Sequence, residues 1–295
     1  MIKTGIFNLR DPFVLNGEDC YYIYGTDVSA GGWSDTRWAL YVSEGKSLEG
    51  KWKRCEGQLY IRPEHAEKNF WAPEVHKYRG EYYMIASYYS SLTRHRGCSV
   101  LKAQAPEGPF REISEGHITP AAWDAIDGTL WVDDGGQPWM VFVHEWTSTD
   151  DGIGRMAAAR LSEDLSRFIS EPKELFRADD APWANYQVTD GCFLFKNSEG
   201  RLHMLWSNSL DGEYRVGIAY SPDGRVDGEW IQLDEPLFTR DTGGGMDGGH
   251  GMIFTSDNGE PYLALHSPND LKEGQLCEEV VLVPLTERCG VPVCT

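Results

Sequence analysis

Acidic side chains stand at the start of several apolar, strand-like segments of this chain. Asp11 precedes "PFVL", Asp127 precedes "GTLW" and Asp190 precedes "GCFLF". Desolvating a carboxylate beside such residues is costly unless the group has a partner, so this repeated placement indicates chemistry. Two carboxylates on one face can act as general acid and general base, as hydrolysis of a glycosidic bond requires. A third carboxylate nearby would raise the pKa of the acid, because like charges resist joint ionisation.

Three further positions extend this set of candidates. Glu74 in "APEV" and the Gly249–His250 pair in "GGHGM" open similar apolar segments. Glu145, in "VHEWTS", is a second candidate for the general acid because it ends a strand expected to return to the same face. Each has a purely structural alternative: a strand-start aspartate often caps a turn, and Glu145 could be a rim carboxylate paired with an arginine.

A hairpin pattern recurs five times along the chain and must position these residues. Each copy has a polar head, an apolar strand, a turn with glycine and a second apolar or aromatic strand, as in "DPFVLNGEDCYYIYGTD". The turn glycines lie 56 to 64 residues apart, at Gly17, Gly80, Gly136, Gly200 and Gly259. Weaker outer hairpins follow three of the copies, which predicts four-stranded antiparallel blades. We therefore expect an all-β fold, a five-bladed β-propeller that forms one catalytic domain over residues 1–295.

Aromatic residues near the strand heads favour a sugar ligand. Trp71 and Trp146 are expected to contact substrate, since the flat apolar face of a sugar packs on such rings, although any single tryptophan could instead be core. His266, in "ALHSP", ends on the same face and is a third candidate contact. His250 among carboxylates suits a metal ion or water, although a hard ion such as Ca²⁺ prefers oxygen ligands.

Charge and cysteine content narrow the class of ligand and the cellular setting. The net charge is −19 and the pI is near 4.8, which predicts a small neutral carbohydrate partner and excludes nucleic acid and anionic membrane. No apolar run is long enough to span a bilayer. The seven cysteines include no C-x-x-C pair, so we expect free thiols, with neither a disulfide framework nor a zinc site. We also expect no organic cofactor. The first residues lack the apolar core of a signal peptide, which favours the cytoplasm, although trimming of an exported protein would leave the same start.

Several motifs, in order and at blade spacing, resemble those of glycoside hydrolase family 43. They are "RDPFV", "FWAPEV", "AIDGTLW" and "GGHGMIF", and the resemblance extends over essentially the whole chain. It implies a five-bladed propeller in which Asp11 is the general base and Asp127 orients the acid and adjusts its pKa. It also implies that His250 helps to hold a metal ion, commonly Ca²⁺, on the propeller axis.

The fourth blade departs from the family pattern. The family usually carries Glu-Gly-Pro there, with the glutamate as general acid, whereas this chain has Thr189-Asp190-Gly191-Cys192. Aspartate is shorter by one methylene, about 1.5 Å of reach, and catalytic geometry tolerates such a displacement poorly. Three interpretations stay open: Asp190 is still the acid, Glu145 takes that role, or the site binds sugar without cleaving it.

The resemblance implies an inverting, exo-acting glycoside hydrolase that removes terminal α-L-arabinofuranosyl or β-D-xylosyl residues from plant-type oligosaccharides or polysaccharides. A β-D-galactofuranosidase of the same fold and a non-catalytic sugar-binding propeller are the alternatives. A fructan-active propeller fits less well, because no Glu-Cys dipeptide lies in the fourth blade. A propeller phosphorylase would need more cationic residues near the strand heads than Arg10, Arg94 and Arg96.

Overall fold

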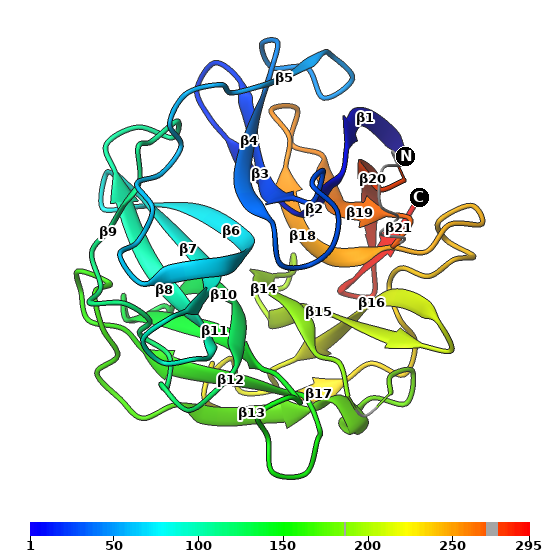
Figure 1. Ribbon diagram of the computed structural model, residues 1–295. Helices are drawn as coiled ribbons and strands as arrows, with labels where there is room; N and C mark the ends of the chain where they lie inside the picture. Colours follow the sequence, from blue (N-terminus) through cyan, green and yellow to red (C-terminus); the bar gives the residue numbers. More distant parts are fainter. Residues whose placement is uncertain (186, 270–276) are drawn as a thin grey trace.

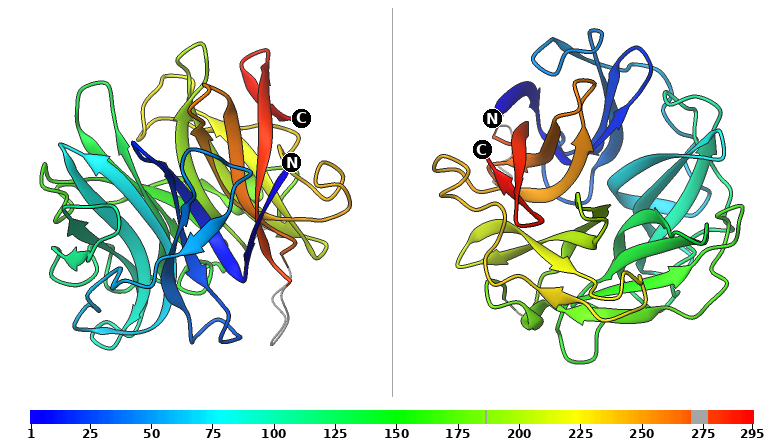
Figure 2. Two further views of the ribbon diagram at one scale, coloured as in Figure 1. Left: turned by 90° about the horizontal axis from the view of Figure 1, so that it is seen from above. Right: turned by 180° about the vertical axis from the view of Figure 1, so that it is seen from behind.

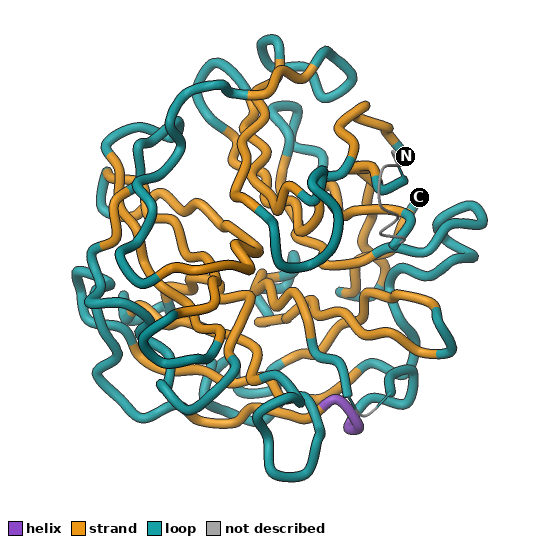
Figure 3. The backbone as a smooth tube through the Cα atoms, in the orientation of Figure 1, coloured by secondary structure: helices purple, strands orange, loops and turns teal. Residues whose placement is uncertain are grey.

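Five antiparallel sheets stand around a central axis in the computed structural model (Figure 1). The structure describes residues 1–185, 187–269 and 277–295. Strands alternate with turns and loops throughout, and the helical content of the described residues is one short 3-10 turn, η1 (Ala178–Asp180) (Figure 3). The predicted all-β fold, a five-bladed β-propeller with four-stranded antiparallel blades, is confirmed.

Four of the blades are built from consecutive strands, which run from the axis outward. Blade one contains β2 (Leu9–Asn16), β3 (Tyr21–Asp27), β4 (Arg37–Ser43) and β5 (Trp52–Arg54). Blade two contains β6 (Ala66–Tyr78), β7 (Glu81–Ser90), β8 (Arg96–Ala103) and β9 (Arg111–Glu112). Blade three contains β10 (Ala125–Val132), β11 (Pro138–His144), β12 (Arg155–Arg160) and β13 (Lys173–Arg177). Blade four contains β14 (Asp190–Lys196), β15 (Leu202–Leu210), β16 (Glu213–Tyr220) and β17 (Ile231–Gln232).

The fifth blade closes the ring with both ends of the chain. Its inner strands are β18 (Gly249–Thr255), β19 (Pro261–Ser267) and β20 (Glu279–Arg288), and its outer strand is β1 (Ile2–Phe7) from the N-terminus. The short β21 (Val291–Cys294) pairs with the far end of β20, and the two termini lie near each other at this blade (Figure 2). The repeat pattern did not predict this closure, because β1 precedes the first hairpin and finds its partner only when the ring forms.

Aromatic and aliphatic side chains fill the spaces within and between the blades. Trp206 of β15 is fully buried and packs against Trp183 and Phe176, with ring centroids 4.5 and 5.4 Å away. Burial of one such side chain contributes about 1.5–3 kcal/mol. The expectation of free thiols holds for the buried Cys98 and Cys192. Within the described part of the chain, no helix has the length and hydrophobicity needed to cross a membrane.

Each inner strand contains the same irregularity, which lies near the start of four of them and in the middle of the longer β6. The pairing with the second strand shifts register there, as in a β-bulge, and one residue adopts a positive φ. These bulge residues are Asp11 (53°), Ala72 (43°), Asp127 (56°), Gly191 (59°) and His250 (50°). A bulge changes the alternation of side chains along the strand, so that consecutive residues, such as Arg10 and Asp11, face the same end of the propeller.

The bulges correct the alignment of repeats made from sequence. Asp11, Asp127 and His250 occupy one equivalent position, and Asp190 lies one residue before it. The placement of Glu74 at a matched head is wrong, because the bulge of β6 falls two residues earlier, at Ala72. Glu74 is buried and its carboxylate lies 2.9 Å from Nε2 of His76.

Candidate active site

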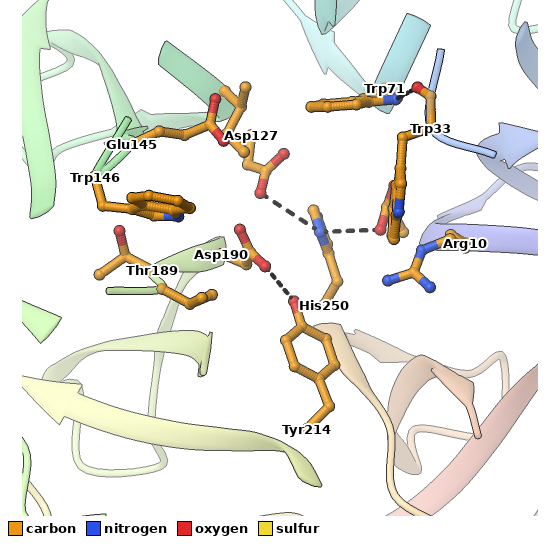
Figure 4. A pocket seen from close by; sticks show the side chains of 13 residues that line it. Arg10, Trp33, Trp71, Asp127, Glu145, Trp146, Thr189, Asp190, Tyr214 and His250 are labelled. Atoms are coloured by element: carbon orange, nitrogen blue, oxygen red, sulfur yellow. Dashed lines mark hydrogen bonds and ion pairs between the residues drawn. The ribbon is translucent and has the colours of Figure 1, made fainter. Parts of the chain in front are cut away.

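A cavity of about 210 Å³ opens on the propeller axis where the inner strands begin. All five blades contribute to it: Asp11, Trp71, Asp127, Asp190 and His250 come from β2, β6, β10, β14 and β18. Its lining residues are Arg10, Asp11, Trp33, Trp71, Ile126, Asp127, Glu145, Trp146, Val188, Thr189, Asp190, Tyr214 and His250 (Figure 4). Among the candidate residues drawn from the sequence, Glu74 and His266 are not placed in this lining.

Asp11 is held by donors on both of its carboxylate oxygens. The Thr26 hydroxyl donates to Oδ2 at 2.6 Å, and Nδ1 of His250 lies 3.2 Å from Oδ1. Burial by itself raises the pKa of Asp11, but the charge and hydrogen bond of His250, with the nearby Arg10, outweigh it. The pKa of Asp11 therefore lies well below its usual range. This carboxylate is ionised at neutral pH, as a base that takes a proton from water must be.

His266 lies behind Asp11, outside the lining of the cavity. The Asp11 backbone N–H donates to Nδ1 of His266 at 3.4 Å, and Nε2 of His266 lies 3.2 Å from Oδ1 of Asn269. Burial, followed by the charge of Arg10, holds the pKa of His266 well below its usual value. The ring is therefore neutral and fully buried, so it supports the general-base candidate from behind.

His250 links two of the carboxylates. Its Nδ1 lies 3.2 Å from Asp11 and 3.6 Å from Asp127. Burial alone would lower its pKa, but these two aspartates raise the pKa of His250 to about 10. In the described ranges no group of three or more His, Cys, Asp or Glu side chains is arranged to hold a metal ion, and the Ca²⁺ ion expected beside His250 stays a prediction. In the structure as described, the imidazolium supplies the positive charge between the two carboxylates.

The opposite side of the cavity retains protons. Burial, reinforced by the charges of Asp190 and Asp11, raises the pKa of Asp127 to about 8, despite the opposing effect of His250. Burial also raises the pKa of Asp190, although the Tyr214 hydroxyl donates to its Oδ2 at 2.7 Å. A hydrogen bond of 3.0 Å from the Gly191 backbone N–H to Oδ2 of Asp127 ties the two acids together. This pair can hold a proton at neutral pH, as a general acid requires.

Glycine at position 191 has a structural cause. Its φ is +59°, and a Cβ there would lie 2.8 Å from the Cα of His250. An L side chain would therefore be strained and would also collide with the fifth blade. Glycine in the "TDG" motif therefore lets the backbone next to Asp190 pack closely against His250 of the fifth blade.

Glu145 follows β11 and reaches the cavity from its rim. Nε of Arg96 donates to Oε2 of Glu145 at 2.5 Å, and Arg96 also lies 3.3 Å from Oδ2 of Asp124. Burial raises the pKa of Glu145 to about 7 although Arg96 opposes the shift. The two interpretations drawn from sequence are therefore compatible, because this glutamate is paired with an arginine and also lines the cavity.

Three tryptophans form the walls of the pocket. Trp71 and Trp33 meet edge to face with centroids 6.2 Å apart, and the Trp71 indole N–H donates to the Trp33 carbonyl at 2.9 Å. The Arg10 guanidinium lies 4.4 Å from the Trp33 ring centroid. Trp33 and Trp146 remain 50% and 39% exposed, so their rings are available to a ligand at the mouth.

Sequence reasoning did not assign a role to Trp33, Arg10 or Tyr214. The Gly-Gly-Trp sequence of residues 31–33 carried a usable signal, since an aromatic on a glycine-rich loop has little core to join. Arg10 directly precedes Asp11, and the bulge turns both toward the cavity. Tyr214 had no signal, because it comes from the start of the third strand of blade four and reaches Asp190, on the first strand, only across the folded sheet.

The chain is similar to known proteins over most of its length. Residues 5–287 match the family Glycosyl hydrolases family 43. The extracellular exo-α-(1→5)-L-arabinofuranosidase ArbA of Cellvibrio japonicus (strain Ueda107) is 25% identical over 297 residues, which cover 88% of this chain and 79% of that protein.

Solved structures give the same result. The crystal structure of an endo-arabinase from Bacteroides thetaiotaomicron VPI-5482 is similar with a TM-score of 0.83 and 33% identity, over 98% of each chain. An endo-1,4-β-xylanase from the same organism is similar with a TM-score of 0.79 and 25% identity, over 100% of this chain and 97% of that one. With the carboxylates, the tryptophan walls and the match over nearly the whole chain, the protein belongs to glycoside hydrolase family 43 and hydrolyses glycosidic bonds.

Proposed function

We propose that this hydrolase removes terminal α-L-arabinofuranosyl residues from plant-type arabinan oligosaccharides, with inversion at the anomeric carbon. The observation that carries the proposal is the division of the cavity into an ionised Asp11 on one side and the proton-holding Asp127 and Asp190 on the other. The relatives described as an arabinofuranosidase and an endo-arabinase support arabinan as the substrate class.

In the proposed mechanism, Asp11 removes a proton from a water molecule as that water attacks the anomeric carbon. Asp190 donates its proton to the departing glycosidic oxygen, and the bond between that oxygen and the anomeric carbon breaks. Asp127 and Asp190 share a proton at neutral pH. In the reactive arrangement this proton lies on Asp190, while Asp127 carries the negative charge and accepts the Gly191 N–H. The products are the inverted free sugar and the shortened chain, and the proton returns to Asp190 from Asp11 through solvent.

The size and charge of the cavity support exo action on a neutral sugar. Pockets for drug-sized ligands usually measure roughly 300–1,000 Å³, so a cavity of about 210 Å³ suits a single pentose. The exposed rings of Trp33 and Trp146 at its mouth would pack against the next unit of the chain. Four lining carboxylates disfavour an anionic substrate, so a neutral glycoside is the expected partner.

A β-D-xylosyl substrate is the second candidate, supported by the similar structure described as a xylanase. The cavity alone does not separate a xylosyl from an arabinofuranosyl or galactofuranosyl residue. The cytoplasmic location expected from sequence also stays a prediction, and the Cellvibrio relative is described as extracellular.

The first experiment identifies the sugar and the acid together. We would assay wild type, Asp190→Asn, Glu145→Gln and the surface control Asp257→Asn on nitrophenyl α-L-arabinofuranoside, β-D-xyloside and β-D-galactofuranoside and on arabinan oligosaccharides. We expect arabinofuranosides to be cleaved, with Asp190→Asn losing about 10²–10⁴-fold in kcat on the oligosaccharide and far less on the activated nitrophenyl glycoside. Glu145→Gln should mainly raise KM.

The opposite pattern would assign the acid to Glu145 instead. Sugar binding without turnover by wild type would overturn the proposed hydrolysis. Proton NMR of the first-formed anomer tests the stereochemistry, and retention would contradict the role given to Asp11.

A further inference from the structure

The five bulge residues share a requirement for a hydrogen-bond acceptor. Where the register shifts, the backbone N–H of the bulge residue makes no regular hydrogen bond to the neighbouring strand of its own blade. A buried N–H group needs another acceptor. In four of the five, that partner is a side chain from the second strand of the preceding blade. The bonds run from Asp11 to His266 Nδ1 (3.4 Å), Ala72 to Thr26 Oγ1 (2.8 Å), Asp127 to Ser87 Oγ (3.0 Å) and His250 to Ser207 Oγ (2.9 Å).

These four acceptors occupy one repeated place in the fold. Each lies in the second strand, opposite the residue that precedes its own blade's bulge: Thr26 pairs with Arg10, Ser87 with Trp71, Ser207 with Asp190 and His266 with Gly249. This ring of bonds joins four of the five pairs of neighbouring blades through one polar side chain each, and it gives the bulge N–H groups at those four heads the partner they need.

Blade three breaks this ring. Its residue at the repeated place is Val143, which pairs with Ile126 and is fully buried. Valine has no polar atom, so it cannot accept from the bulge of blade four. The Gly191 N–H donates instead to Oδ2 of Asp127, at 3.0 Å.

Blade one shows what a hydroxyl at this place does. Thr26 accepts the N–H of Ala72 and donates its own proton to Oδ2 of Asp11, at 2.6 Å. The hydroxyl therefore stands between the aspartate of its own blade and the backbone of the next. Among the described residues of blade three, no side-chain hydroxyl lies between Asp127 and the next blade. The Asp127 carboxylate accepts directly from the backbone N–H of Gly191, the residue that follows Asp190.

We infer that Val143 is a positioning residue for the acid. Because its side chain offers no hydroxyl to accept the Gly191 N–H, the Asp127 carboxylate accepts that N–H instead and is held beside Asp190. This inference rests on the proposed function, in which Asp190 is the general acid. The Gly191 N–H favours the state in which Asp127 is ionised and the shared proton resides on Asp190, because a donor to a carboxylate stabilises its charged form.

Other groups around Asp127 do not replace this contact. His250 lies further away, at 3.6 Å, and is shared with Asp11. The Cys192 thiol donates to the Asp127 backbone carbonyl, not to its carboxylate. Asp190 and Asp11 are like charges, which favour the protonated form of Asp127.

The test is Val143→Thr, which adds a hydroxyl at nearly constant volume. We expect the introduced hydroxyl to take the Gly191 N–H and to turn Asp127 toward its own blade, as Thr26 does with Asp11. The kcat on an arabinan oligosaccharide, whose leaving group needs an acid, should fall about tenfold or more. The kcat on a dinitrophenyl arabinofuranoside, whose leaving group does not, should stay within about twofold of wild type. Val141→Thr, two residues earlier in β11 and equally buried, and Val143→Ala control for a buried hydroxyl and for lost volume.

Equal losses on both substrates, or no loss on either, would overturn the inference while leaving the proposed function intact. A wild type without hydrolytic activity would overturn the proposed function, and a second measurement then decides the hydrogen-bond arrangement. The Gly191 amide proton shift should follow the titration of Asp127 in wild type and lose most of that response in Val143→Thr. Val143→Ser serves if the threonine variant does not fold, and an unchanged Gly191 titration in either variant would contradict the inference.

Discussion

Asp11 and Asp127 stand at the same place in blades one and three, yet they have opposite proton affinities. Both are bulge residues with φ near +55° and both face the cavity, where the Asp11 side chain is 13% exposed and the Asp127 side chain 6% exposed. Asp11 has a pKa well below its usual range, whereas Asp127 has a pKa of about 8. Burial alone therefore does not decide the role of a carboxylate in this site.

The difference lies in the partners that each blade supplies. Asp11 receives the Thr26 hydroxyl, the closer approach of His250 and the charge of Arg10. Asp127 has a more distant His250 and the neighbouring Asp190, whose charge opposes its ionisation. Repetition of the fold supplies equivalent positions, and small departures from the repeat turn one position into a base and another into part of an acid pair.

Removing the base should have the largest effect. Asp11→Asn keeps the shape of the side chain but cannot take a proton from water, so kcat should fall by about 10²–10⁴-fold. Asp257→Asn on the surface is the matched control, and thermal melting of both variants checks the fold. If Asp11→Asn retained more than a tenth of wild-type kcat, Asp11 would not be the general base.

The stability of the protein should fall as pH rises through the neutral range. The pKa of His250 is raised from 6.5 to about 10, so the stabilisation it gives is complete below about pH 6.5 and is lost as pH rises through 10. The pKa of Asp127 is raised from 3.8 to about 8, and the folded state again holds the extra proton, so stability falls over that interval too. The combined loss should be on the order of a few kcal/mol.

Urea unfolding at pH 6.5 and pH 9.5 measures this slope. His250→Asn should flatten it, because the imidazolium between the two aspartates is gone. The same variant should move the acidic limb of kcat/KM to higher pH, since Asp11 loses its main positive partner. An unchanged slope in the variant would mean that His250 is not the charge that separates the two aspartates.

The two exposed tryptophans, one on each side of the cavity, are expected to affect substrate binding, and their loss should have the smallest effect on the reaction. Trp33 stands beside Arg10 on the Asp11 side, and Trp146 follows Glu145 on the acid side. Loss of one stacking ring is worth roughly 1–1.5 kcal/mol, so Trp33→Ala and Trp146→Ala should each raise KM about tenfold with little change in kcat. Trp52→Ala, on the outer strand β5, is the control. A fall in kcat without a change in KM would place either ring in the chemistry and not in binding.

Much of this arrangement was predictable because the repeat is local. Turn glycines at fixed intervals and aromatic strands define the hairpins, and hairpins of that number and spacing define the propeller. The heads of the inner strands must then converge, which brings Asp11, Asp127 and Asp190 to one cavity. The placement of Glu74 failed because a bulge moves the register by a residue or two without a clear mark in the sequence.

The sequence by itself determined the fold class, the family and the carboxylates that meet on the axis, since each depends on residues close together in the chain. Tertiary structure decided which carboxylate is ionised and which retains a proton, because those properties depend on partners that are distant along the chain. Tyr214 reaches Asp190 across 24 positions, His266 reaches Asp11 across 255, and the Gly191 amide reaches Asp127 across 64. Such contacts form only when strands pair within a blade and blades pack side by side, and they give chemically identical aspartates their different roles.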